Sequence, residues 1–337
     1  MNQRINYIDL AKGICILLVI LNHIEGPMCD KGFNNTLLSF RMPLFFFLSG
    51  LFFKSYSGLL NFSLRKINKL LVPFFFFLTI TYLMFLSEWV ISGHYNYISA
   101  LPHEIITALM SEDVYLNIPL WFLFALFGTS VIFYLSLMIS NKLTTNKKVQ
   151  KVTMALLCLF IGVAGFELGI HRINLPLWID TSMTSIPFYY TGYFLRQETD
   201  ILAPNKLDKY IPALLVILGL LVYFQTHFIR MVRNEYQGNF ISFYVCAISG
   251  TLFVILISKV IKKLPIISFI GRYSIIALGT HWIIIGILKK TLFFITNSWA
   301  LSITTFILVI LISIPVIKLL KKYFPKFVSQ QDLIKVD

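Results

Sequence analysis

Long apolar runs separated by short polar segments dominate this sequence. A helix needs roughly 20 predominantly apolar residues to cross the hydrocarbon core of a bilayer, and about ten segments come near that length. We therefore predict an all-α, polytopic integral membrane protein. The predicted spans cover residues 8–25, 34–53, 70–92, 118–140, 152–169, 174–195, 210–229, 239–258, 265–288 and 299–320.

The charge content excludes a soluble fold. Only 13% of the 337 residues are charged, which is too few to coat a soluble domain of this size. The net charge of +14 does not indicate a nucleic-acid partner, because the Lys and Arg residues form short clusters between apolar runs. We predict one transmembrane domain over 1–325 and a short cytoplasmic tail over 326–337, in a multi-pass protein of the cell membrane surrounded by lipid.

The distribution of Lys and Arg between the predicted loops indicates how the chain crosses the membrane. Cytoplasmic loops of membrane proteins carry an excess of these residues. With a cytoplasmic N-terminus, 21 of the 29 Lys and Arg residues fall in cytoplasmic segments and 6 in outer loops. The other two, Arg41 and Arg272, lie inside predicted spans. This division predicts that both termini are cytoplasmic.

Two ionisable side chains share a face of the first predicted helix. Lys12 and His23 are 11 residues apart, which is about three turns, or about 16 Å along the axis. Ionisable groups inside spans usually face a cavity or a partner. Imidazole is well suited to proton transfer near neutral pH, so His23 is a candidate general base. The alternative is a His23 that only hydrogen-bonds to a neighbouring helix.

Further polar residues point to sites at both ends of the predicted bundle. Arg41 lies near the outer end of the second span, about level with His23. Ser274 and His281 are two turns apart and therefore share a face of the ninth span. Arg65, Lys66 and Lys69 form a basic cluster that either binds phosphate from the cytoplasm or only fixes the topology. The Cys and His residues show no metal-ligand spacing, so we predict no metal site.

Several motifs, in order along nearly the whole chain, resemble those of the membrane-bound acyltransferase family 3. Residues 7–23 contain a basic residue followed by His eleven positions later, as the opening of that family does. Residues 41–50 (RMPLFFFLSG) resemble its second-helix motif, and residues 66–73 its basic loop. Residues 119–123 and 271–281 resemble later landmarks. Within the family, the chain most resembles the sugar O-acetylase branch, typified by fucose 4-O-acetylase.

The resemblance implies ten helices, an acyl-CoA donor taken from the cytoplasm and an acceptor that is a sugar. It implies that His23 is the catalytic residue and Lys12 its paired basic residue. Three departures are visible, since Lys12 is often Arg in the family, Lys66 and Lys69 replace an Arg pair, and Arg41 stands where related sugar acetylases often have His. Lys lacks the bidentate fork of Arg and binds phosphate as a point charge.

These inferences lead to one predicted function and its alternatives. The predicted function is O-acyl transfer, most simply O-acetyl transfer from acetyl-CoA, to a hydroxyl of a cell-surface polysaccharide or its lipid-linked sugar precursor. A translocator of such sugars without acyl transfer is the alternative, and a structural membrane subunit would leave the intramembrane charges unexplained. We expect catalysis by His23 with support from Arg41, Ser274 and His281, and donor binding by Lys12, Arg65, Lys66 and Lys69.

Overall fold

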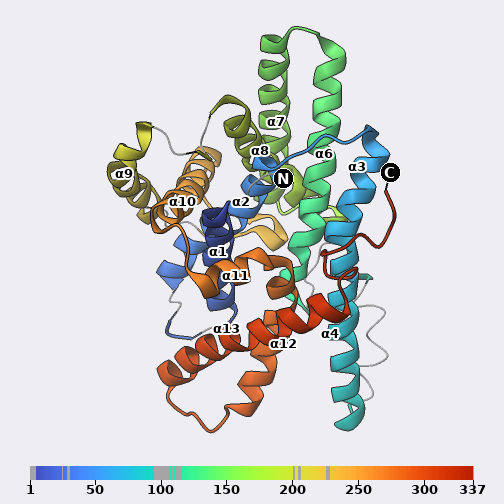
Figure 1. Cartoon of the computed structure of the whole chain (residues 1–337), viewed down its shortest axis with the longest axis vertical. Coiled ribbons are helices and arrows are strands. Elements are labelled where there is room, and N and C mark those ends of the chain that lie inside the picture. Colours follow the sequence, from blue (N-terminus) through green and yellow to red (C-terminus); the bar gives the residue numbers. More distant parts are fainter. Residues whose placement is uncertain are drawn as a thin grey trace.

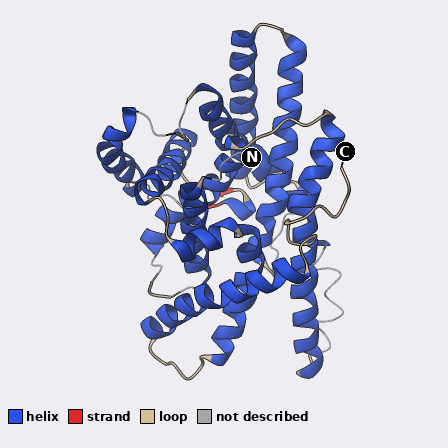
Figure 2. Cartoon of the chain, viewed as in Figure 1, coloured by secondary structure: helices blue, strands red, loops and turns tan. Residues whose placement is uncertain are grey.

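The chain is built almost entirely from helices in the computed structural model (Figure 2). The structure describes residues 5–24, 26–28, 31–94, 106–107, 109–110, 116–199, 202–203, 206–224 and 228–336. Most of the predicted outer loop between the third and fourth spans lies outside these residues. The strands of the described part are the two-residue β1 (Ile229–Arg230) and β2 (Glu235–Tyr236), which pair antiparallel.

The helices follow the apolar runs of the sequence. In the first half they are α1 (Asn6–Ile24), α2 (Lys31–Leu51), α3 (Gly58–Lys66), α4 (Val72–Ile91), α6 (Trp121–Leu143) and α7 (Lys147–Ile170). In the second half they are α8 (Ile179–Glu198), α9 (Ile211–Tyr223), α10 (Phe240–Ile261), α11 (Pro265–Arg272), α12 (Ser274–Thr291) and α13 (Ser298–Tyr323). A π-helical turn, η1 (Ile67–Leu71), joins α3 to α4. Short 3₁₀ turns are η2 (Ile118–Leu120), η3 (Pro176–Trp178), η4 (Lys206–Tyr210) and η5 (Met231–Arg233).

Six helical segments of the described chain are long and apolar enough to cross a membrane. They are Asn6–Ile24, Gly58–Ile91, Ile118–Leu143, Lys147–Ile170, Phe240–Ile261 and Ser298–Tyr323. The bent pair α11 and α12 makes a seventh if it counts as one span. These helices confirm the predicted all-α fold with several candidate membrane spans, and the count of ten spans stays a prediction. The other predicted spans correspond to α2 and α8, which are rich in polar residues, and to α9, which has 13 residues.

Three predicted spans differ in form from the helices observed. The third span is part of a 34-residue helical segment that begins at Gly58, before the basic cluster, instead of at residue 70. The span predicted over 210–229 is wrong at its end, since α9 stops at Tyr223 and β1 begins at Ile229. The span predicted over 265–288 breaks at Tyr273, where α11 and α12 meet at 98°. Hydropathy alone does not reveal such a bend, because both pieces are apolar.

Glycines set two close helix crossings at the centre of the molecule. A Cβ on Gly271 of α11 would lie 1.9 Å from the carbonyl oxygen of Asp9 on α1. A Cβ on Gly50 of α2 would lie 1.8 Å from the carbonyl oxygen of Tyr189 on α8. Small residues allow this approach of two backbones, as is common between membrane helices. The crossings hold α1 and α2 against their neighbours in the middle of the bundle (Figure 1).

We expect Gly271→Ala to destabilise the protein, because the added methyl group has no space between α1 and α11. Overpacking of this kind costs on the order of 1–3 kcal/mol. The matched control is Gly286→Ala in α12, where an added Cβ meets no atom within 4 Å. Thermal unfolding of the detergent-solubilised protein should show a lower midpoint for Gly271→Ala and an unchanged or higher one for Gly286→Ala. Equal midpoints would contradict the tight crossing.

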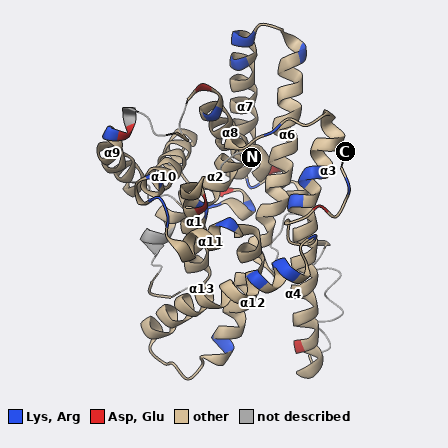
Figure 3. Cartoon of the chain, viewed as in Figure 1, with Lys and Arg blue, Asp and Glu red and all other residues tan. Residues whose placement is uncertain are grey.

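Lys and Arg side chains are spread unevenly over the molecule (Figure 3). Most of the Lys and Arg segments lie in the upper half of Figure 3, on α3, α6, α7 and α9, and fewer lie at the lower end. The loop between α6 and α7 forms the upper end, and the loop between α12 and α13 lies at the lower end (Figure 1). The orientation with both termini in the cytoplasm stays a prediction.

Candidate active site

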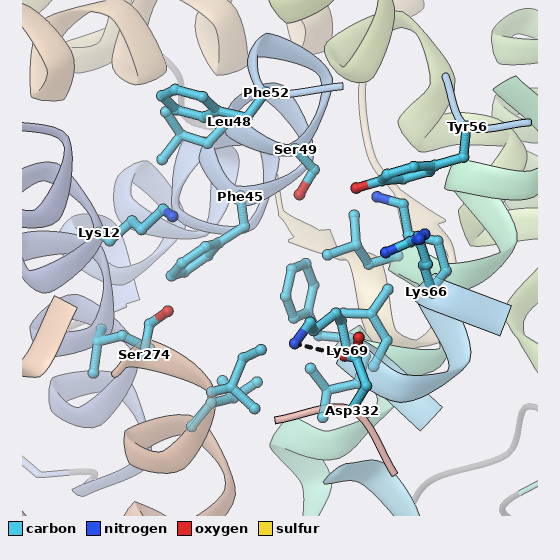
Figure 4. Close-up of a pocket in the computed structure, with 18 residues that line it drawn as sticks. Lys12, Phe45, Leu48, Ser49, Phe52, Tyr56, Lys66, Lys69, Ser274 and Asp332 are labelled. Atoms are coloured by element: carbon cyan, nitrogen blue, oxygen red, sulfur yellow. Dashed lines mark ion pairs between the residues drawn. The ribbon is translucent and has the colours of Figure 1, made fainter. Parts of the chain in front are cut away.

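A cavity of about 330 Å³ collects the predicted donor-binding residues. Lys12, Arg65, Lys66 and Lys69 all line it, together with Ser274. Figure 4 shows Lys12 and Ser274 on one side of this cavity and Lys66 and Lys69 on the other. Four cations from two distant parts of the chain therefore face one space, which we call the basic cavity. Such a lining favours a ligand with several negative charges, such as phosphate groups.

Helix geometry explains why these side chains meet. Arg65, Lys66 and Lys69 lie at the end of α3 and in the π-helical turn η1, where the extra residue per turn redirects the side chains. The Arg65 guanidinium stacks on Tyr56, with 4.7 Å from its carbon to the ring centroid. Ser274 is the first residue of α12, so the positive end of that helix dipole adds to the charge of the cavity.

The C-terminal segment forms part of the wall of the basic cavity. Asp332 lines the cavity, and its carboxylate oxygen lies 2.9 Å from Lys69 Nζ (Figure 4). Asn68, which is fully buried, donates to the Ile334 carbonyl at 2.7 Å and accepts from the Leu333 and Ile334 amides. The predicted tail over 326–337 is therefore docked on η1, and Asp332 lowers the net positive charge of the cavity.

We expect Asn68→Ala to release this docked tail, because the change removes three hydrogen bonds at once. Trypsin should then cleave after Lys326 faster than in the unchanged protein, where the nearby Val328 is fully buried. Asn61→Ala on α3 is the control, since the Asn61 amide donates to Ser57, one turn earlier in the chain. Mass spectrometry of the digest measures the cleavage. Equal rates in the two variants would show that Asn68 does not hold the tail.

A second cavity, of about 480 Å³, contains the predicted catalytic residue. His23 and Arg41 line it, as do Asn22, Trp121 and Trp282. Arg41 is only 5% exposed, so its charge lies inside the protein. We call this space the histidine cavity. The structure thus brings Arg41 to His23, as their similar predicted depth in the membrane suggested.

His281 lies beside His23 behind the surface of the histidine cavity. The two imidazole centroids are 5.4 Å apart, and Trp282 makes an edge contact with His23 at 5.2 Å. His281 Nδ1 lies 3.0 Å from the Ala277 carbonyl oxygen, which can only accept, so Nδ1 carries a proton. In the neutral ring Nε2 is then an acceptor, and within the described residues it has no hydrogen-bond partner. Neutral His281 can therefore take a proton or a hydrogen bond but cannot donate one to an oxyanion.

The two cavities lie next to each other along α1. Lys12 and Ile16 line the basic cavity, and Val19 and His23 line the histidine cavity. Leu278 of α12 lines both cavities, so a single side chain belongs to the wall of each. Ser274, which the sequence grouped with His281, lies instead in the basic cavity with Lys12. Two turns of α12 carry Ser274 to one cavity and His281 to the edge of the other, about 10 Å along the axis.

The sequence did not reveal the segment that covers the histidine cavity. Arg230 and Arg233 line this cavity from β1 and η5, although both were counted only as outer-loop residues. The Trp178 indole donates to the Val232 carbonyl at 3.1 Å, and Thr181 donates to the Met231 carbonyl at 3.0 Å. One signal was present in the sequence, since Arg in a predicted outer loop runs against the usual charge distribution.

Apolar helices that enclose ionisable side chains in internal cavities define a multi-pass membrane protein with an internal site. A family model described as an acyltransferase domain matches residues 5–318. The chain belongs to acyltransferase family 3 and is a membrane acyltransferase. Comparisons with curated proteins and with solved structures gave no match.

Proposed function

We propose that this protein transfers an acetyl group from cytoplasmic acetyl-CoA to a hydroxyl of a cell-surface polysaccharide or of its lipid-linked sugar precursor. The observation that carries the proposal is the pair of adjoining cavities, one lined by four cations and the other by an imidazole. The phosphates of the donor would bind Lys12, Arg65, Lys66 and Lys69. The thioester arm would extend past Leu278 toward His23.

In the proposed reaction, His23 acts as the general base. Its imidazole takes the proton of the acceptor hydroxyl while that oxygen attacks the acyl carbonyl. The carbon–sulfur bond then breaks, and protonated His23 gives its proton to the sulfur, so that CoA leaves as the free thiol. In the two-step alternative, His23 attacks the acyl carbonyl and displaces the CoA thiolate, and the acceptor hydroxyl then takes the acyl group from His23 and loses its proton, which leaves a free imidazole and protonated CoA thiol. Arg41 is the proposed donor to the developing oxyanion, because it always carries its proton and neutral His281 offers an acceptor there. His281 would then orient His23.

Reconstitution tests this function directly. Purified protein in liposomes, given acetyl-CoA labelled in the acetyl group, should move label to oligosaccharide acceptors. Mass spectrometry of surface glycans from cells with and without the protein should show the corresponding loss of O-acetyl groups. Binding of acetyl-CoA separates this function from the translocator, which has no need of a donor site. A protein that moves sugars but does not bind acetyl-CoA would overturn the proposal.

We also propose ten membrane crossings with both termini in the cytoplasm. The six long apolar helices and the bent pair α11–α12 support this count, with α2, α8 and α9 completing it. Reporter fusions after residues 60, 145, 204 and 337 should report the cytoplasm, and fusions near 30, 103, 172 and 234 the outside. A cytoplasmic signal at residue 103 would contradict ten crossings.

A further inference from the structure

Four helices contribute to the walls of both cavities. Along α1, Ile16 is the last residue at the basic cavity, and Val19, three residues later, is the first at the histidine cavity. α12 has the same order, since it begins with Ser274 at the basic cavity and reaches the histidine cavity at Trp282. Both helices therefore lead from the cationic site to the imidazole.

The other two helices, α2 and α6, have the reverse order. On α2, Met42 lines the histidine cavity and Phe45, three residues later, lines the basic cavity. On α6, Trp121 lines the histidine cavity and the next residue, Phe122, lines the basic cavity. Because α1 packs against α2 and α12, and α2 packs against α6, all four helices change from one cavity to the other at one level. That level is the level of Leu278, which lines both cavities.

Apolar side chains fill the level between the two cavities. The rings of Phe45 and Phe122 lie 5.4 Å apart between centroids, and this contact joins α2 to α6. The side chains at this level are each 8% exposed or less, so the boundary between the cavities is closely packed. We call them the apolar collar. Its members are Ile16, Val19, Met42, Phe45, Phe122 and Leu278.

The reaction proposed above requires the donor to cross this collar. The phosphates of the donor are expected in the basic cavity, and its acyl group is expected at His23 in the histidine cavity. The acyl group is the end of a linear arm, so it is the first part of the donor to enter the collar. Closely packed side chains have to move apart for every atom of width that passes between them. The collar therefore acts on the width of the acyl group.

Room at the reacting end does not impose the same limit. The histidine cavity encloses about 480 Å³, against about 330 Å³ for the basic cavity, so the space beyond the collar is the larger one. Leu278 is the collar residue best placed to set the width, because it belongs to both walls and is 2% exposed. Shortening Phe45 or Phe122 would also remove the contact between α2 and α6. Leu278 therefore gives the clearest test.

We propose that Leu278, within the apolar collar, determines which acyl groups this protein accepts. A narrow, unbranched acyl group such as acetyl passes Leu278 to reach His23, and an acyl group that branches next to its carbonyl is held back in the basic cavity. This inference rests on the proposed function and specifies its donor. The donor class is a CoA thioester of a small, unbranched acyl group.

The test compares acetyl-CoA, propionyl-CoA and isobutyryl-CoA, each labelled in the acyl group. The full-length protein in liposomes receives each donor with oligosaccharide acceptors. We expect a kcat/KM for acetyl-CoA about tenfold or more above that for isobutyryl-CoA, because a poorly fitting methyl group in an apolar passage costs about that much. Propionyl-CoA, which is longer but no wider, should lie much closer to acetyl-CoA. Equal values for acetyl-CoA and isobutyryl-CoA would overturn the proposal.

Variants at Leu278 change the width in both directions. Leu278→Ala should raise kcat/KM for isobutyryl-CoA about tenfold or more relative to acetyl-CoA, since it widens the passage. Leu278→Met, which nearly conserves the volume, should keep the original preference. Leu278→Phe should lower transfer from acetyl-CoA about tenfold or more. Its binding of 3′-phospho-ADP, the part of CoA that lacks the arm, should stay unchanged, which also shows that this variant is folded.

Two controls carry the same Leu→Ala change. Leu288 lies on the same helix and is 7% exposed, but it is not among the described residues that line either cavity. Leu38 lines the histidine cavity one turn before Met42, so Leu38→Ala enlarges that cavity away from Leu278. Both controls should keep the original ratio of kcat/KM between acetyl-CoA and isobutyryl-CoA. A change in this ratio by Leu38→Ala as large as that by Leu278→Ala would show that room in the cavity sets the preference, and would overturn the proposal.

A binding measurement keeps the outcome clear if turnover is slow. Trp121 and Trp282 line the histidine cavity, so an acyl group that passes the collar should change tryptophan fluorescence. A change with acetyl-CoA but not with isobutyryl-CoA, and with both donors in Leu278→Ala, supports the proposal. The same change with both donors in the unaltered protein overturns it. The absence of acetyl-CoA binding would instead overturn the proposed function, so the two failures are distinguishable.

Discussion

Replacing His23 by Gln should lower the rate of acyl transfer about 10²–10⁴-fold, which is the usual contribution of general acid–base catalysis. Gln keeps polarity and much of the volume of His but cannot accept and release a proton near pH 7. His23→Ala should be about as inactive. Acetyl-CoA binding should stay close to normal in both variants, because the donor phosphates are expected in the basic cavity. Labelled acetyl transfer and equilibrium binding measure the two effects separately.

The control for this change is His171→Gln, since His171 is exposed after the end of α7 and lines neither cavity. It should transfer acetyl groups at the normal rate. A merely structural His23 would behave differently, because hydrogen bonds between membrane helices average about 0.6 kcal/mol and Gln would largely replace one. Near-normal transfer by His23→Gln would therefore refute the catalytic role and direct attention to His281.

The double variant Lys66→Ala/Lys69→Ala should bind acetyl-CoA more weakly and with less dependence on salt. Each lost charge-assisted contact costs on the order of 1–3 kcal/mol, so the two together should raise Kd by roughly 30-fold or more. Changing both to Arg should retain binding, since Arg keeps the charge and adds donors. Equilibrium binding of acetyl-CoA at several salt concentrations measures the effect.

Two controls make this result specific. Lys147→Ala/Lys148→Ala removes the same charge from the exposed start of α7, away from both cavities, and should leave binding unchanged. Asp332→Asn removes the partner of Lys69 and keeps the lysine, so donor binding should be unchanged or tighter. Unchanged binding in the Lys66/Lys69 double variant would leave these lysines with a topological role only.

The sequence by itself determined the class of fold and the residue types of the site. Runs of apolar residues long enough to cross a bilayer permit only helices, because backbone polar groups in lipid must be satisfied within the segment. The spacing of Lys12 and His23 put both on one face of a helix, and the structure has both lining cavities along α1. Local periodicity carries this information, since the helical repeat is fixed.

Only the tertiary structure decided which of these residues meet. Ser274 and His281 lie on the same helix, α12, but packing places Ser274 at the basic cavity and His281 beside His23, a division that the helical repeat alone could not predict. Arg230 and Arg233 join His23 because contacts from α7 and α8 fix the hairpin, more than 200 residues along the chain from His23. Asp332 reaches Lys69 through bonds that Asn68 makes to the far end of the chain. Such encounters depend on packing between distant segments, for which a single sequence holds no local signal.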